Sequence, residues 1–555
     1  MAGSLGAESG RIPAGFKLGL FWQLLLLGLL IRCGLALILP PGYDEAYYLF
    51  YGKNLSLSYF DHPLAVGLWS WLGGVISRLP TPELSGTALL FALRIPSLLA
   101  YTAALGLISD ATRRWFGRPA ALAALLIGSV SPLLFLCGGL LLLPDSPLLL
   151  VLAALLNWLS RRDAILPASA AESLALGGLL GLATLGKYHA LLILLAVMAC
   201  ALSRRRERVL LLRPWPWLTI PVWLLVSCPL WIWNASNGWV SFLFHSGRTN
   251  ARHLFDPAGP LLFLLSQQLL LYPTIGALLL WVLLRPLLHW LPQERFASEQ
   301  ASRAAALIRW LVWPQLILFL LLSGRMQVLA SWLVPAWWLL LPLAGNALAA
   351  LWQGPRRRGV MLSLWGTLLP LSLLVPLAAA QTRWDVLGRW LPAGIDPSGQ
   401  LMVPEDLRRA LQANPIIWSE LRRTELIATT RYDLPGFLAL AIGPHSKAEY
   451  SAFGKDARGF AWWQPAGGFR DQSGVLVLFQ RPGDASALQR RSDELPPRLR
   501  RQLPSLRSLG VAVVNRNGQP TVQMELLRFG PLQQSWRRAY GPWRNRNNAG
   551  RSGRP

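Results

Sequence analysis

The chain has 555 residues, of which 53% are hydrophobic and only 14% are charged. A soluble domain carries about 25% charged residues, so this composition excludes a single soluble globule, a disordered chain and a fibrous repeat. The 27 tryptophans and 42 prolines are typical of a multi-pass membrane protein with aromatic belts. The net charge of +26 indicates anionic lipid headgroups or a phosphate-bearing substrate as partners, and nucleic acid is not expected.

About eleven apolar segments approach the roughly 20 residues that a helix needs to cross a bilayer. The first is too long for the core of a signal peptide and no small-residue cleavage site follows it, so we expect a retained anchor. Residues 1–17 are then a cytoplasmic N-terminus. The predicted spans are 18–39, 86–108, 120–138, 145–160, 170–186, 188–203, 214–233, 259–284, 305–323, 332–352 and 359–379.

Four arginine clusters orient these segments, because cytoplasmic loops carry the excess of Lys and Arg. Segment 163–203 lies between two of the clusters, so it must cross the membrane an even number of times. Its turn at Gly186–Tyr188 is therefore expected on the outer side, together with the region after residue 380. The clusters are 113–118, 161–162, 204–208 and 356–358.

After residue 380 the composition becomes typical of a soluble domain. Val475–Phe479 reads as a strand, and Val511–Val514 with Val522–Leu527 reads as a hairpin about an Asn-Gly turn. We therefore predict a small α/β domain over 380–534, outside the membrane. The basic, Gly- and Asn-rich stretch 535–555 is expected to be a disordered tail.

The first outer loop, residues 40–85, is predicted to contain two interfacial helices, Tyr43–Tyr59 and Pro63–Leu79, which are rich in Tyr, Trp and Leu. It also holds the densest polar cluster of the chain. Four titratable groups lie within 19 residues next to a membrane face: Asp44, Glu45, Asp61 and His62.

Two interpretations of the pair Asp44 and Glu45 stay open. A carboxylate pair just outside a span can deprotonate a hydroxyl group or hold a divalent cation. Carboxylates are also favoured at a helix N-terminus, where they cap backbone N–H groups. The residues alone favour neither interpretation, and the two roles are compatible.

Lys187 lies within an otherwise apolar run of about 30 residues, where an ionisable group is a functional hypothesis by default. The alternative is a lysine that extends its ammonium group to the interface. The predicted topology places Lys187 on the same side as Asp44, which favours a function. In contrast, Asp145 reads as a helix N-cap, and Arg32 as a residue that bonds neighbouring helices or extends outward to the interface.

Other candidates on the outer side are Arg94, His245, Arg248 and Arg325. A single loop arginine is usually a solvated residue or a headgroup contact. Together these side chains are expected to surround one cavity with positive charge.

Five separated motifs occur here in the order that they have in bacterial members of glycosyltransferase family 39, which the chain resembles over roughly 18–350. That family includes protein O-mannosyltransferases and aminoarabinose lipid A transferases. Arg431–Leu434 only looks like the tail of such proteins. The motifs are Tyr43–Tyr48, Tyr59–Pro63, Ala92–Ser97, Pro144–Pro147 and Gly186–Tyr188.

The resemblance implies a GT-C fold with about eleven transmembrane helices in a bacterial plasma (inner) membrane. It implies an inverting transfer, on the outer face, from a polyprenyl-phosphate sugar to a lipid, polysaccharide or protein acceptor. Asp44 falls on the family's presumed base or acceptor-orienting residue. His62 replaces the lysine of a Phe-Glu-Lys-Pro motif, whereas Asp61 keeps the acid; a divalent metal contact would fall on Asp61 and His245.

A polyprenyl phosphate leaves only when its charge is neutralised. The predicted phosphate and sugar contacts are His62, Arg94, Lys187, Tyr188, Arg248 and Arg325, of which the cationic members supply charge-assisted hydrogen bonds. A carboxylate, with Asp44, Glu45 and Asp61 as the candidates, then takes the proton of the acceptor hydroxyl.

Two other function classes, a lipid transporter and a scaffold, are alternatives to this hypothesis. A flippase or other multispan lipid transporter for polyprenyl-linked sugars predicts repeated halves and broken helices at the bilayer midplane. The sequence shows no repeat, and its candidate charges lie at the outer face. A scaffold for the soluble domain would not need loop carboxylates that face cationic loops.

Overall fold

The computed structural model describes residues 14–79, 83–249, 254–288, 296–355, 357–391, 396–454, 456–465, 468–480, 497–516 and 518–534. The predicted tail 535–555 and most of the predicted N-terminus 1–17 lie outside the described residues.

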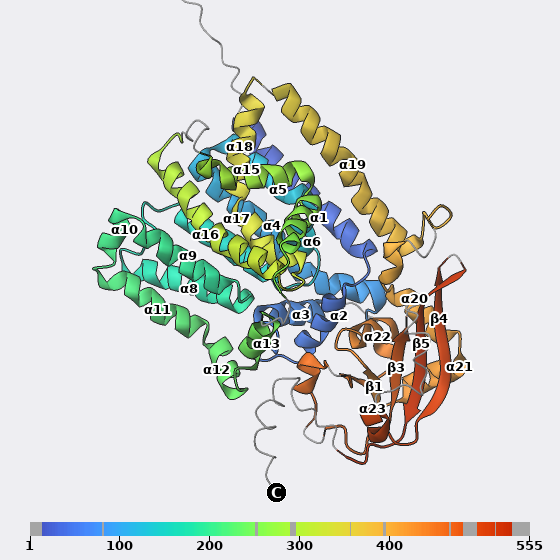
Figure 1. The fold of residues 1–555 in the computed structure, drawn as a ribbon. Helices are drawn as coiled ribbons and strands as arrows, with labels where there is room; N and C mark the ends of the chain where they lie inside the picture. Colours follow the sequence, from blue (N-terminus) through green and yellow to red (C-terminus); the bar gives the residue numbers. More distant parts are fainter. Residues whose placement is uncertain are drawn as a thin grey trace, which may run out of the picture.

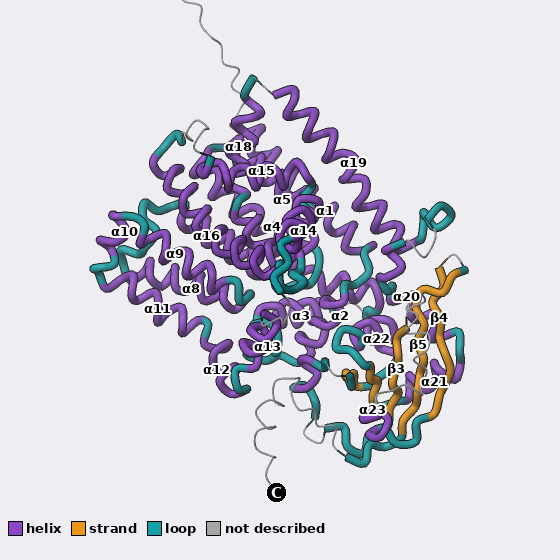
Figure 2. Tube along the Cα trace, viewed as in Figure 1, coloured by secondary structure: helices purple, strands orange, loops and turns teal. Residues whose placement is uncertain are grey.

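Helices build the chain as far as Trp384, and a mixed domain follows (Figures 1 and 2). Buried Leu, Ala and Trp side chains from most of these helices form one large core. The helices are α1 Ala14–Ile38, α2 Tyr43–Lys53, α3 Ala65–Ile76, α4 Gly86–Phe116, α5 Arg118–Val130, α6 Pro132–Gly139, α7 Asp145–Leu159, α8 Ala170–Gly186, α9 Ala190–Leu202, α10 Arg205–Leu210, α11 Pro214–Val226, α12 Cys228–Ser236, α13 Val240–Thr249, α14 Ala258–Leu270, α15 Pro273–Leu284, α16 Glu299–Ser323, α17 Val334–Leu339, α18 Leu341–Gln353 and α19 Arg357–Trp384.

Each predicted span coincides with helical structure, but the helices differ in form. Four of them, α1, α4, α16 and α19, are long and apolar enough to cross a membrane, and four bent pairs bring the number to as many as eight. The remaining three predicted spans correspond to the shorter helices α7, α8 and α9. The chain is therefore a multi-pass membrane protein.

Four of the predicted spans are broken into two helices that meet at an angle. The two halves meet at 75° in α5–α6, 54° in α11–α12, 120° in α14–α15 and 60° in α17–α18. In every pair, the second helix carries a proline at its first or second position. Proline favours a break at these positions, because it lacks an N–H group and its ring clashes with the previous turn, although Pro96 and Pro314 lie inside the continuous helices α4 and α16.

The first outer loop forms the two expected interfacial helices, but both are shorter than predicted. Helix α2 ends at Lys53, because Asn54 caps it by donating from its side chain to the carbonyl oxygen of Phe50. A short non-helical segment with a bridge between Ser58 and Pro63 then leads to α3. Helices α2 and α3 lie between the helical part and the C-terminal sheet (Figure 1).

The C-terminal domain has a five-stranded sheet in the order β2-β1-β3-β5-β4. β1 pairs in parallel with β2 and β3, whereas β3, β5 and β4 pair antiparallel. The predicted strand and hairpin are β3, β4 and β5, although Asn517 of the turn lies outside the described residues. Sequence missed β1 and β2, which have four residues each. The bounds are β1 Leu426–Thr429, β2 Glu449–Ala452, β3 Gly474–Gln480, β4 Arg507–Arg516 and β5 Gln519–Phe529.

Alternating strand residues point to opposite faces of the sheet, and their side chains pack into two hydrophobic cores, one on each face. Ile427 and Val475 pack with the helices α20 Pro404–Gln412, α21 Pro415–Arg423 and α22 Pro435–Ile442. Their neighbours in the strands pack on the other face with α23 Pro497–Gln502.

The C-terminal domain docks directly on the first outer loop. Helix α22 packs against α2, and a Cβ atom at Gly436 would clash with the backbone of Ala46, so this contact requires glycine. Glu405 of α20 binds the backbone N–H of Thr87 at 2.7 Å and Arg383 of α19 at 2.6 Å. These contacts hold the soluble domain over the loop that carries the candidate carboxylates.

Candidate active site

Glu45 and Arg94 form a fully buried, two-pronged ion pair, with Nε to Oε1 at 2.8 Å and Nη2 to Oε2 at 2.6 Å. The other three guanidinium N–H groups donate to the carbonyl oxygens of Ala36, Leu39 and Pro40. All five donors of Arg94 are therefore used within the protein.

This pair changes the role of two predicted site residues. Glu45 also accepts from the backbone N–H groups of Leu142 and Gly42, and the Gly42 bond closes a capping box at the start of α2. The geometry therefore makes Glu45 a cap and a buried counter-ion rather than a catalytic base. Arg94 ties α4 to the end of α1 and presents no N–H group to a lipid phosphate.

Asp61 lies at the centre of a dense polar contact set. Its carboxylate accepts hydrogen bonds from the hydroxyl groups of Tyr51 and, at 3.4 Å, Tyr47, both from α2. Its second oxygen forms an ion pair of 3.0 Å with Arg458 of the C-terminal domain. Asp61 is buried, so this partnership joins two segments that are far apart in the sequence.

Asp44 lies on α2 and is only partly buried. The hydroxyl oxygen of Tyr432 lies 3.5 Å from Asp44, a contact too long for a strong hydrogen bond, and the guanidinium carbon of Arg458 lies 3.6 Å from the centre of the Tyr432 ring. One arginine–tyrosine stack of the C-terminal domain therefore contacts both Asp44 and Asp61.

The electrostatics of this stack favour a charged Asp61. Burial alone raises the pKa of the Asp61 carboxyl, but the charge of Arg458 and the Tyr51 hydrogen bond outweigh it and leave the pKa below its ordinary value. Burial has the opposite effect on His62 and lowers its pKa to about 3, assisted by nearby cations. His62 is therefore neutral at physiological pH and brings no charge to a phosphate.

Lys187 is buried, and its ammonium group binds both carboxylate oxygens of Asp145, at 2.8 and 3.0 Å. Its third contact, to the carbonyl oxygen of Ser331, is long at 3.5 Å. The prediction of Asp145 as an N-cap is wrong, because Pro144 occupies that position and Asp145 is the counter-ion of Lys187. The spacing of 42 residues along the chain gave no local signal for this pair.

His245 and Tyr188 lie side by side, with ring centroids 5.0 Å apart. The Nε2 atom of His245 lies 3.0 Å from the backbone carbonyl oxygen of Asp61, where it donates as the Nε2–H tautomer. The Asp61 carboxylate itself faces Arg458 and Tyr51. Within the described ranges, no group of three His, Cys, Asp or Glu residues is placed to hold a metal ion.

The two remaining predicted cations are Arg325 and Arg248. Arg325 is exposed in the loop after α16. Arg248 lies in α13, but its side chain lies outside what the structure describes. Sequence reasoning missed Tyr432, Arg458 and the tyrosines of α2 as site residues. Two of them had a signal, Tyr432 in the motif Arg431–Leu434 and Tyr47 in the motif Tyr43–Tyr48.

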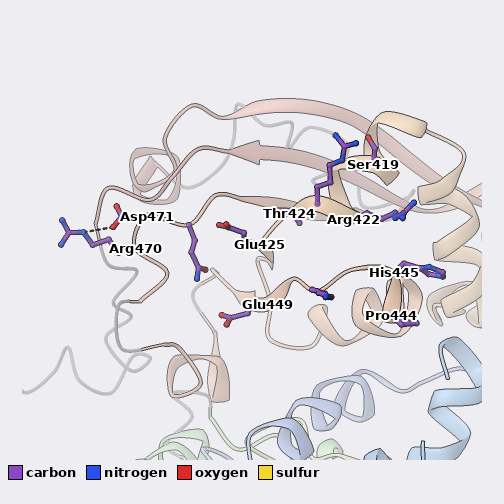
Figure 3. A pocket seen from close by; sticks show the side chains of 12 residues that line it. Ser419, Arg422, Thr424, Glu425, Pro444, His445, Glu449, Arg470 and Asp471 are labelled. Carbon is purple, nitrogen blue, oxygen red and sulfur yellow. Dashed lines mark ion pairs between the residues drawn. The ribbon is translucent and has the colours of Figure 1, made fainter. Parts of the chain in front are cut away.

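A separate cavity of about 950 Å³ lies at the edge of the C-terminal sheet, beside β2 (Figure 3). Glu425 directly precedes β1 and Glu449 begins β2 there, while Arg422 and His445 approach from the helical side (Figure 3). Acidic and basic groups are mixed along its wall, and none of the predicted site residues lines it. The carboxylate site therefore lies elsewhere, between α2 and the C-terminal domain.

Three comparisons relate this geometry to known proteins. Residues 80–233 match the family described as dolichyl-phosphate-mannose-protein mannosyltransferase. Apo ArnT from Cupriavidus metallidurans is 15% identical with a TM-score of 0.54, covering 91% of this chain and 97% of that one. The same protein bound to undecaprenyl phosphate is 16% identical with a TM-score of 0.55, covering 92% and 98%. No curated protein sequence matches the chain.

Proposed function

Because this chain is a GT-C-fold membrane protein related to the protein mannosyltransferases, we propose that it transfers a sugar from a polyprenyl-phosphate donor to an acceptor. One observation carries the proposal. Asp44 and Asp61, from the first outer loop, share one arginine–tyrosine stack of the C-terminal domain. A carboxylate pair that lies between the membrane helices and the soluble C-terminal domain suits an acceptor hydroxyl group that arrives from outside the membrane.

Asp44 is the general base in this proposal. Glu45 is neutralised by Arg94, and Asp61 is a weak base because its pKa is lowered by Arg458. Asp44 takes the proton while the acceptor oxygen attacks the anomeric carbon from the face opposite the phosphate. The bond between that carbon and the phosphate oxygen breaks, the phosphate leaves with the electron pair, and the sugar configuration inverts.

Lys187 is the proposed contact of the donor phosphate. An ammonium group has three donors, and two of them are held at short range by Asp145. The third faces Ser331 over 3.5 Å, which is too long for a strong bond and leaves this donor for a phosphate oxygen. The related fold of ArnT bound to undecaprenyl phosphate supports a lipid phosphate as the ligand.

The arginine clusters support the orientation that we propose. In this orientation the N-terminus lies in the cytoplasm of a bacterium and the C-terminal domain on the outer side of the plasma membrane. Nucleotide sugars are absent there, which fits a donor carried by a lipid.

The test uses membranes that contain the full-length chain and a labelled polyprenyl-phosphate sugar. The variant D44N should lose at least 100-fold in transfer while it stays folded and inserted, since positioned bases contribute about 10²- to 10⁴-fold. The matched control D163N removes a carboxylate whose side chain is 77% exposed, and it should keep wild-type transfer. Full activity in D44N would refute the base, and translocation of the donor without transfer would establish a flippase instead.

A further inference from the structure

A cavity of about 410 Å³ lies beside the carboxylate site and is not used by the mechanism above. Three separate parts of the chain build it: the segment after α2, the end of α12, and a turn of the C-terminal domain. Its lining residues are Asn54, Leu55, Ser56, Ser58, Tyr59, Phe60, Trp233, Gly459, Trp462, Trp463 and Gln464.

Aromatic rings form the walls of this cavity. The ring of Trp462 packs between Phe60 and Trp233, with centroid distances of 5.1 and 6.0 Å. Its indole N–H donates to the side-chain oxygen of Asn237 at 2.9 Å, which fixes the orientation of the ring. Trp462 is therefore a rigid aromatic platform before any ligand arrives.

Trp463 forms a second platform, and its place depends on a glycine. A Cβ atom at Gly459 would lie 2.5 Å from the ring of Trp463, so only glycine allows this approach. The backbone N–H of Gly459 donates to the hydroxyl group of Tyr47 at 2.8 Å. The same turn of the C-terminal domain thus holds the ring and contacts the carboxylate site.

The polar groups of the cavity are neutral. None of its described lining residues carries a charge, and they supply amide and hydroxyl groups. The Nε2 atom of Gln464 is buried and has no hydrogen-bond partner among the residues that the structure describes. An unpaired buried amide costs free energy unless a ligand satisfies it.

Aromatic platforms together with a few neutral amides and hydroxyls match the chemistry of an uncharged sugar ring. The C–H face of a pyranose packs on an indole, and its hydroxyl groups bond amides. The lining offers no cation for the phosphate of a lipid-linked donor. Two lining residues are also neighbours of the Asp61–Arg458 ion pair in the sequence. Phe60 directly precedes Asp61, and Gly459 directly follows Arg458.

We propose that this cavity binds an uncharged sugar ring of the acceptor and holds it beside the reacting hydroxyl. This inference rests on the proposed function, and it narrows the acceptor to a glycan or glycolipid.

Sugar binding is tested first, without any transfer step, by saturation-transfer NMR on the full-length protein in nanodiscs. The probes are the methyl glycosides of glucose, galactose, mannose and N-acetylglucosamine. At least one should receive saturation at its ring protons, and the variant W462L should reduce the signal at least fivefold. W462F keeps an aromatic face and should retain most of it, as should the control W390L, whose tryptophan is 73% exposed.

Loss of the amide is expected to weaken the same binding. The variant Q464L should raise the dissociation constant about tenfold, the effect of one hydrogen bond to a neutral group. Equal signals in the wild type, W462L and Q464L, or no signal from any probe, would overturn the proposal.

Transfer kinetics then decide which sugar occupies the cavity. In W462L, the acceptor-membrane concentration at half-maximal rate should rise about tenfold, with the half-saturating donor concentration unchanged. A change confined to the donor would assign the cavity to the donor sugar and overturn the proposal. Sugar binding that W462L abolishes, in a wild type that transfers nothing, would support the cavity and refute the proposed function.

Discussion

The Nη1 atom of Arg458 lies 3.0 Å from the Oδ2 atom of Asp61, although 397 residues separate them in the chain. This ion pair joins the soluble domain to the first outer loop, at the point where the candidate carboxylates lie. Because both side chains are largely buried, neither is compensated by water if the other is removed. The C-terminal domain is therefore a part of the site and not an appendage to it.

Replacing Arg458 with glutamine should destabilise the docking of the C-terminal domain. Removal of one partner from a buried ion pair costs about 3–5 kcal/mol, and the lower end applies because the Arg458 side chain is 15% exposed. We expect R458Q to lower the thermal midpoint in detergent and to speed limited proteolysis between the two parts.

The matched control for R458Q is R409Q. Arg409 pairs with Asp406 one turn away on α20, and the two side chains are 77% and 20% exposed, so its loss should change the midpoint little. Equal midpoints for R458Q and R409Q would contradict the role given to the Asp61 ion pair.

The variant E45Q should lower the stability of the protein more than it impairs the transfer reaction. Glutamine keeps the shape of Glu45 but leaves Arg94 as an uncompensated buried charge, with a cost of about 3–5 kcal/mol. We expect a lower thermal midpoint and poor expression, with a near-normal donor concentration at half-maximal rate for the folded fraction. A stable E45Q protein that cannot transfer sugar would make Glu45 catalytic after all.

The sequence predicted the broad architecture because long apolar segments and arginine clusters are local signals. The breaks at Pro132 and Pro273 coincide with prolines of the sequence, but prolines alone do not locate a break, because Pro96 and Pro314 lie inside continuous helices. The short strands β1 and β2 were missed because four buried residues show no periodicity that separates strand from helix.

For the site, the sequence predicted some of the residues but not their partners. The motifs identified Asp44, Asp61 and Lys187, but the partner of each polar group is set by folding rather than by spacing. Neither Asp145 as the counter-ion of Lys187 nor Arg458 as that of Asp61 carries a sequence signature. An isolated arginine in a basic soluble domain reads as a surface residue until the domain docks.

A double-mutant cycle on Lys187 and Asp145 should separate stability from donor binding. K187M and D145N each leave one buried charge without its partner, so each should destabilise the protein by about 3 kcal/mol or more. The double variant leaves no charge and should recover most of that stability. It should not recover transfer, because the proposed phosphate contact is missing.

Thermal midpoints and donor-dependent rates measure the two sides of this cycle. Recovery of transfer in the double variant would show that Lys187 serves structure alone. Strict additivity of the two single effects would show that the pair, at 2.8 Å in the structure, is not coupled.

His62 should influence acid stability rather than the charge of the site. Its pKa is lowered to about 3 chiefly by burial, so it stays neutral in the folded protein at pH 5–8. In the unfolded chain His62 binds a proton below about pH 6.5, while the folded protein does not until the pH nears its own, lower pKa. The free energy of unfolding should therefore decrease as the pH is lowered below 6.5, by up to about 1.4 kcal/mol per pH unit.

The variant H62Q should lose the part of this dependence that His62 contributes and keep the wild-type pH profile of transfer between pH 5 and 8. A transfer profile that shifts in H62Q would instead show a titrating, charged His62 in contact with the substrate.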